Sequence, residues 1–321
     1  MAVLNAHTMR DKSVTTEFAI GGAAGLLDCT LFHWIDTIKV RRQDNRPLLM
    51  NLRTGGALTL ADAANSVPRF LRTALASLYA GFSTNLSLKL PYMALMFAFD
   101  AANKRLLNAL RPEGSGSPVL TQLVSAGLVG LEVSLLLSPL EMVRIQGQNC
   151  GKGGLLEATR AVLATAAVPS SPLSQLATLS RGLPATSQRE IKYCLGQFFL
   201  CEQIAAAVAE RTGGGDGAPP TMGAQIVGAV AGGAACTIVS HPDDVIKTRM
   251  QTHLRGSPHF GTYTGYWSTG RHIAQQEGVA RGLFKGAFIR CALRVPLGLS
   301  VIMISSQAMR AAVVERREGS P

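Results

Sequence analysis

The chain has 321 residues, of which 47% are hydrophobic and only 16% are charged, and its formal net charge is +11. A soluble domain carries about 25% charged residues, so this composition argues against one and favours a chain that hides much of its surface in lipid. The positive charge suits an anionic lipid surface or an anionic solute. Nucleic acid is not expected as a partner, because the basic residues lie at the ends of apolar segments rather than in a polar stripe.

The N-terminal segment, residues 1–16, has no apolar core long enough for a secretory signal. The six cysteines are scattered along the whole chain, with no C-x-x-C pair and no histidine at metal-binding spacing. We therefore expect no disulfide framework, no metal site and no cofactor. Because no nucleophile–base arrangement and no glycine-rich phosphate loop stands out either, we do not expect an enzyme.

Six apolar segments follow, at 17–40, 81–110, 119–145, 183–210, 221–250 and 286–314. Each is long enough to cross a hydrocarbon core as a helix, which takes about 20 residues. All of them contain polar or charged side chains, among them Asp28, Lys89, Glu132, Arg189, Glu190 and Arg294. Ionisable groups inside a membrane are costly and normally face a bundle interior or a wet cavity. Six helices around an aqueous cavity are therefore expected.

The first, third and fifth segments end in related sequences: WIDTIKVRRQ at 34–43, PLEMVRIQGQ at 139–148 and PDDVIKTRMQ at 242–251. In each, an acid is followed three residues later by a base and four residues after that by Gln, and the acids lie 105 and then 103 residues apart. A second landmark recurs as LYAGF at 78–82, LSRGL at 179–183 and LFKGA at 283–287. The pattern predicts three repeats, at 17–111, 112–212 and 213–314, followed by a C-terminal tail at 315–321.

The threefold P-x-[DE]-x-x-[KR]-x-[KR]-x-Q pattern, complete in the third repeat, resembles the signature of the mitochondrial carrier family. The resemblance extends over essentially the whole chain. It implies an all-α membrane protein with six transmembrane helices in three pseudo-threefold repeats and short matrix-side helices. It also implies a multi-pass protein of the mitochondrial inner membrane that exchanges one solute for another by alternating access.

The resemblance further implies a matrix gate, in which acids of one repeat pair with bases of the next. Its candidate residues are Asp36, Lys39, Gln43, Glu141, Arg144, Gln148, Asp244, Lys247 and Gln251. An acid and a base three residues apart are neighbours on a helix surface, which agrees with such a ring. Cardiolipin near the matrix ends of the helices is implied in the same way, and the basic residues there suit an anionic headgroup.

The solute is expected to meet Lys89, Arg189, Glu190 and Arg294, which follow the landmark glycines by seven or eight residues. Three bases and one acid at mid-depth favour a small anionic or zwitterionic metabolite, amino-acid-like for preference, because Arg can hold a carboxylate and Glu190 can receive an ammonium group. The alternative is structural: Arg189 and Glu190 pair with each other, or with Asp28 or Glu132.

The chain departs from the family pattern at several positions. Trp34 replaces a proline, Gln146 a base and Lys192 another proline. The opposite, cytosolic gate lacks bases, since Asn103, Ala205 and Ala308 occupy their positions. A cavity open to the intermembrane space is therefore expected, because only the matrix gate retains its ion pairs. The same losses leave a second function open, in which a divergent carrier fold without transport serves as a structural subunit of a larger inner-membrane complex.

Overall fold

A computed structural model of the chain describes residues 13–43, 47–49, 56–79, 82–110, 117–150, 155–212, 220–257 and 259–318. Within these ranges the regular structure consists of helices, with no strand. The expected all-α fold is confirmed.

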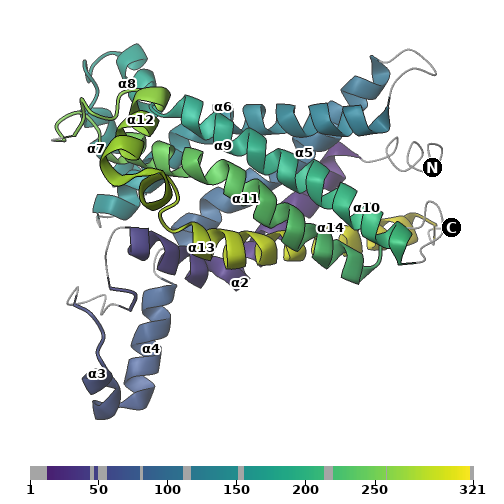
Figure 1. The fold of residues 1–321 in the computed structure, drawn as a ribbon, viewed down its shortest axis with the longest axis horizontal. Coiled ribbons are helices and arrows are strands. Elements are labelled where there is room, and N and C mark those ends of the chain that lie inside the picture. Colours follow the sequence, from purple (N-terminus) through teal and green to yellow (C-terminus); the bar gives the residue numbers. More distant parts are fainter. Residues whose placement is uncertain are drawn as a thin grey trace.

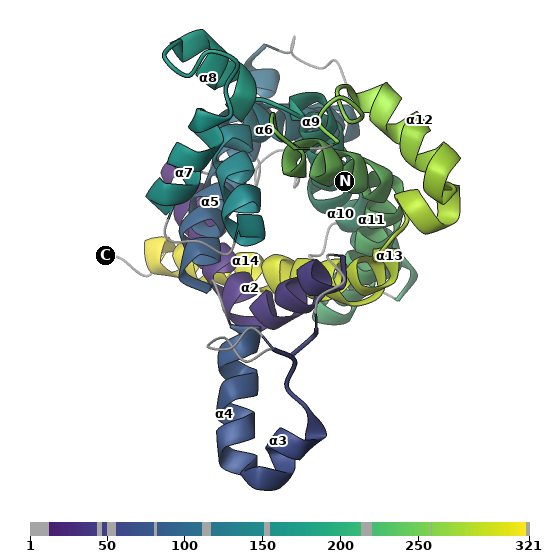
Figure 2. The same ribbon diagram turned by 90° about the vertical axis from the view of Figure 1, so that its left-hand side faces the viewer.

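Six long helical spans form the body of the molecule (Figure 1). They are α2 (Val14–Gln43), α5 (Phe82–Ala109), α6 (Pro118–Cys150), the continuous run of α9 (Leu183–Leu195), η1 (Gly196–Leu200) and α10 (Cys201–Arg211), then α11 (Met222–Thr252), and the run of α13 (Ala287–Ile289), η3 (Arg290–Arg294) and α14 (Val295–Glu318). Each span contacts the next, and α14 contacts α2, so the ring is closed. Figure 2 shows this ring along its axis.

Four spans are long and apolar enough to cross a membrane by composition alone: α2, α6, α11 and the span from Arg290 to Val313. The other two, α5 and α9–α10, are more polar and carry Lys89, Arg189 and Glu190. In a ring, such residues can face the interior instead of lipid, which is how a charged span remains compatible with a membrane.

Short helices connect the spans at the end of the bundle where α2, α6 and α11 terminate, which is called the gate end below; the opposite end is called the terminal end. These helices are α3 (Leu60–Asn65), α4 (Val67–Leu78), α7 (Leu155–Ala164), α8 (Pro172–Leu179), α12 (Tyr266–Glu277) and η2 (Val279–Leu283). Seen along the axis, α3 and α4 extend away from the ring, whereas α7, α8 and α12 stay at its rim (Figure 2).

Glycines set how closely neighbouring spans approach. A Cβ added to Gly130 on α6 would lie 2.5 Å from Cα of Ile191 on α9, and one added to Gly228 on α11 would lie 2.4 Å from the carbonyl oxygen of Cys201. Lipid gives helices no hydrophobic reason to associate, so close backbone contact provides much of the attraction. Gly182 has a different role. It directly precedes α9 and adopts a positive φ of 82°, a backbone conformation that favours glycine.

We predict that Gly130→Ala destabilises the protein by about 1–3 kcal/mol, because the new methyl group collides with the backbone of α9. Gly127→Ala is the matched control three residues earlier, where nothing lies within 4 Å of the added Cβ. Thermal unfolding of the detergent-purified variants gives the measurement. Equal melting temperatures for the two variants would mean that α6 and α9 are not packed as described.

Candidate functional site

A cavity of about 270 Å³ lies inside the ring, and all six spans contribute to its wall. It runs from Met93, Val133 and Leu299, near the middle of the spans, to Arg144 and Thr248 at the gate end. The C-terminal halves of α2, α6 and α11 meet there with the N-terminal parts of the other three spans. This crossing brings the two repeated landmarks of the sequence, the acid–base motif and the landmark glycine, to the same end of the ring.

The terminal half of the ring is filled by an apolar cluster to which every span contributes. Within it, the rings of Phe97 on α5 and Phe198 on η1 are in edge-to-face contact, with centroids 5.4 Å apart. Leu299 and Met303 add further buried volume from α14. The cavity therefore lies in the gate half. The sequence led us to expect an opening toward the intermembrane space, and that stays a prediction.

Polar pairs also join the spans toward the terminal end. Arg310 on α14 donates to both carboxylate oxygens of Glu17 on α2, at 2.9 and 2.7 Å. The Asn103 amide donates to Glu132 at 2.9 Å, which joins α5 to α6. Sequence reasoning missed these pairs because it looked only for bases at the family positions. Arg310 stands two residues after Ala308, and Asn103 is an amide whose acid lies on another span.

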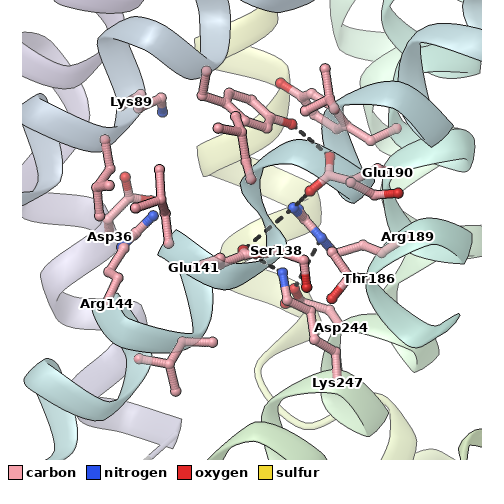
Figure 3. Close-up of a pocket in the computed structure, with 18 of the residues that line it drawn as sticks. Asp36, Lys89, Ser138, Glu141, Arg144, Thr186, Arg189, Glu190, Asp244 and Lys247 are labelled. Atoms are coloured by element: carbon pink, nitrogen blue, oxygen red, sulfur yellow. Dashed lines mark hydrogen bonds and ion pairs between the residues drawn. The ribbon is translucent and has the colours of Figure 1, made fainter. Parts of the chain in front are cut away.

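Arg189 and Glu190, on α9, meet in the cavity as an ion pair. The Arg189 guanidinium also lies 3.7 Å from Glu141 and 3.9 Å from Asp244. Glu190 accepts a hydrogen bond of 2.6 Å from the Tyr92 hydroxyl. The two residues thus pair with each other, as in the structural alternative, and Arg189 additionally lies near two acids of the expected matrix gate (Figure 3).

Lys89 and Arg294 approach from the other side of the cavity and share one acid, Asp28 on α2. The Asp28 side chain is buried, with 1% of the residue exposed. Arg294 holds it in a bidentate contact at 2.8 and 2.9 Å. The three expected bases therefore line one cavity, but each already has an acidic partner. The sequence had flagged Asp28 only as a partner for Arg189 or Glu190.

One expected gate contact between repeats is present, because Lys247 on α11 forms an ion pair with Glu141 on α6. The other two acids form ion pairs with arginines of the sixth span. The N–O distances are 2.6 Å from Arg294 to Asp36 and 3.2 Å from Arg290 to Asp244. Arg144 lines the cavity. The side chains of Lys39, Gln43 and Gln148 lie outside the described part of the chain. Arg290 is an addition that the repeat pattern did not indicate; it stands on the π-helical turn η3 together with Arg294.

Glutamine side chains tie α11 to its neighbours beside the gate. Gln251 is buried, and its amide lies 3.5 Å from the Arg181 carbonyl and from the Thr186 hydroxyl. Gln146, which stands where the family has a base, donates to the Gln251 carbonyl at 2.5 Å and to the Thr252 carbonyl at 3.1 Å. At the position of the family's base, Gln146 thus links α6 to α11 by hydrogen bonds.

Lys192, which replaces a proline of the pattern, pairs with Asp243 on α11 at 2.6 Å. Asp243 is buried and also accepts a hydrogen bond from Tyr266, the first residue of α12. Burial, and then the bond to Asp243, raise the pKa of the Tyr266 hydroxyl, so it stays a donor. Lys192, Asp243 and Tyr266 therefore connect α9 and α11 to the short helix α12.

A second hollow, of about 380 Å³, lies at the rim between the start of α9 and the start of α12. It is bordered by Gly182 and Gly265, the residues that precede these two helices, and by Arg181 and Arg255. Helix N-termini and arginines both attract anions. Among the side chains that the structure describes, no cluster of three His, Cys, Asp or Glu could hold a metal ion.

Comparison with known proteins agrees with this architecture. A family model described as "Mitochondrial carrier protein" matches residues 10–110 and 218–312. Mitochondrial glutamate carrier 1 of Homo sapiens is 27% identical over 317 residues, covering 90% of this chain and 92% of that protein. Mitochondrial glutamate carrier 2 of Rattus norvegicus is 28% identical over 309 residues, covering 90% and 91%. A mitochondrial coenzyme A transporter of Danio rerio is 29% identical over 219 residues, covering 68% and 64%.

We predict that Glu141→Gln destabilises the protein by about 3–5 kcal/mol, because it leaves the buried Lys247 ammonium without its partner. Lys247→Met should cost less, because Arg189 lies 3.7 Å from Glu141 and still compensates it. The double variant should lose clearly less than the sum, and thermal unfolding measures this coupling. Arg249 and Glu277 give the control pair, since they are paired at 2.6 Å but partly exposed, and their coupling should be about 0–1 kcal/mol. Additive losses at Glu141 and Lys247 would refute the contact.

Proposed function

The chain belongs to the mitochondrial carrier family, and we propose that it carries a small, negatively charged, amino-acid-like solute, such as glutamate, across the mitochondrial inner membrane. It is a mitochondrial membrane protein with helical spans, and a solute carrier rather than an enzyme. The solute class, the inner membrane and the exchange mechanism are the parts that we propose.

One observation carries the choice of solute: cationic and anionic groups face the same cavity at one depth. Arg189 and Glu190 are adjacent on α9, while Lys89 and Arg294 approach from the second and sixth spans. An amino acid with an acidic side chain presents two carboxylates and one ammonium group. Arginine binds a carboxylate in a planar, bidentate manner, and a carboxylate receives an ammonium group. The three bases Lys89, Arg189 and Arg294 can therefore hold the two carboxylates, and Glu190 can receive the ammonium group.

The charge balance of the cavity points the same way. Six basic side chains line it, namely Lys89, Arg144, Arg189, Lys247, Arg290 and Arg294. The acidic ones are Asp36, Glu141, Glu190 and Asp244, and Asp28 contacts the wall from behind. Among the described side chains one positive charge is thus left over. A solute of net charge −1 neutralises it, which lowers the cost of closing the site away from water.

The relatives support the same class, since two of them are named for glutamate and match this chain over most of its length. We propose that transport is an exchange by alternating access. The gate pair Glu141–Lys247 would stabilise closure at the gate end, and the pairs Glu17–Arg310 and Asn103–Glu132 closure at the terminal end. Both ends then have ion pairs or hydrogen bonds that can break and re-form.

A structural subunit of a larger inner-membrane complex is the second candidate. The observation that favours it is the middle repeat, because the family model matches 10–110 and 218–312 and leaves the residues between them unmatched. Lys192, bound to Asp243, lies in that repeat. The polar pairs toward the terminal end weaken this candidate, since they join spans at the end where the missing gate bases first suggested it.

Cardiolipin is the lipid partner that we propose, and the second hollow is its site. The N-termini of α9 and α12 border this hollow together with Arg181 and Arg255, and both kinds of group attract the phosphates of an anionic headgroup. Arg181 already donates to the carbonyls of Met250, Phe260 and Tyr263, so it holds the rim in shape. Arg255, over the Phe260 ring at 5.7 Å, is the base left to approach the lipid.

We predict that Arg189→Ala lowers uptake of L-glutamate into liposomes by about ten- to hundredfold, the effect of losing about 1.5–3 kcal/mol of charge-assisted hydrogen bonding. Arg189→Lys should retain part of the uptake. Arg249→Ala is the control, because Arg249 pairs with Glu277 outside the cavity. Normal uptake by Arg189→Ala would remove Arg189 from the solute site. A wild-type protein that moves no amino acid and purifies within a large complex would support the second candidate instead.

We predict that cardiolipin raises the melting temperature of the delipidated protein and that Arg255→Gln reduces this rise, because a bound ligand stabilises the folded state in proportion to its affinity. Arg271→Gln, an exposed residue of α12 that does not line the hollow, serves as the control. An equal rise in all three proteins would place the lipid elsewhere.

A further inference from the structure

Asp28 is a carboxylate behind the cavity wall rather than in it. It lies on α2, is almost fully buried, and contacts two cations that do line the cavity, Lys89 and Arg294. A buried charge of this kind strongly destabilises a protein when it loses its partner. Asp28 therefore balances two of the cations that line the cavity.

Most of the hydrogen-bond donors of the Arg294 guanidinium are already bound to carboxylates. Of its five N–H groups, four point at carboxylate oxygens: Nη1 and Nη2 at Asp28, and Nε and Nη2 at Asp36, at distances between 2.6 and 3.1 Å. One N–H remains, so no pair of donors is left for a third carboxylate to bind in a bidentate manner. A solute carboxylate can bind Arg294 in this way only if one of the two resident acids leaves it.

Asp28 can leave Arg294 without becoming an unpaired charge. Its second partner, Lys89, keeps it compensated when Arg294 turns away. The contact between Asp28 and Arg294 is also closely fitted, because a Cβ at Gly298 would lie 2.5 Å from Nη1 of Arg294 and 2.7 Å from Oδ1 of Asp28. A glycine at this position is what leaves room for the pair.

We propose that Asp28 is a resident competitor of the transported carboxylate: it occupies Arg294 in the empty carrier and passes it to the solute, while Lys89 retains Asp28. This rests on the proposed transport of a carboxylate solute, which it deepens. Asp28 does not touch the solute and is a positioning residue. It weakens solute binding and so allows release, because the carboxylate of Asp28 takes Arg294 back.

The first experiment measures how freely Arg294 reacts and needs no transport. Phenylglyoxal modifies arginine side chains, and mass spectrometry of the peptide that contains Arg294 gives the rate. We expect Asp28→Asn to speed the modification several-fold, and Gly298→Ala to do so without any change of charge, because its methyl group separates the pair. Gly127→Ala is the control, since nothing lies within 4 Å of its added Cβ. Rates equal to the wild type in both variants would overturn the proposal.

The second experiment separates a competitor from a group that merely orients Arg294. For L-glutamate uptake into liposomes we expect Asp28→Asn to lower KM by about tenfold, which corresponds to about 1.4 kcal/mol, and to lower kcat because release slows. The melting temperature without ligand should fall, while the rise on adding L-glutamate should increase. A raised KM would show that Asp28 orients the arginine and would overturn the proposal. Absence of L-glutamate uptake by the wild type would count against the proposed function, and the labelling rates would still decide the role of Asp28.

Discussion

A charge inside a membrane bundle needs a counter-charge, and this constraint organises the described part of the ring. The idealised cost of moving an ion into a medium of low dielectric constant is about 20 kcal/mol, and several kcal/mol remain after relaxation. The chain meets this constraint mostly between spans: α2 pairs with α5 and α14, α6 with α11, and α9 with α11. Close helix contact at glycines brings the partners within reach. Pairing and packing therefore depend on each other.

The same pairs can explain why such a ring is able to change state. Replacing a buried ion pair by apolar groups is often neutral or stabilising, so these pairs add little net stability to one closed form. Their value lies in the difference between two arrangements, because a two-state equilibrium is shifted by contacts that only one state makes. Glu141–Lys247 belongs to the gate end, and Glu17–Arg310 belongs to the terminal end. Under the proposed exchange, each of these pairs would have to break in one of the two forms.

Repetition made the fold predictable from the sequence, because three copies of an acid–base motif fix the direction and the end of three spans. The same repetition placed Lys89, Arg189 and Arg294 around one cavity. Partners were harder to predict. Arg294 finds Asp28 across 266 positions of sequence and Arg310 finds Glu17 across 293, and which side of a helix meets which neighbour depends on small rotations of each span. Where the chain departs from the pattern, as at Lys192, its new partner Asp243 could not be read from any repeat.

The arginines of the sixth span connect the cavity to the gate. Arg294 holds Asp36 as well as Asp28, and Arg290 holds Asp244, so two of the three acids that the repeats assign to the gate are bound to bases of another span. On the opposite wall, Arg189 lies near Glu141 while Lys247 completes that pair. Any group that occupies these arginines therefore changes the charge around the gate acids at the same time. Since the gate acids are the groups expected to close the matrix side, solute binding and gate closure draw on one set of charges. Under the proposed transport, a solute carboxylate that binds these arginines would free a resident acid for the gate, so bound solute would favour closure of the gate end.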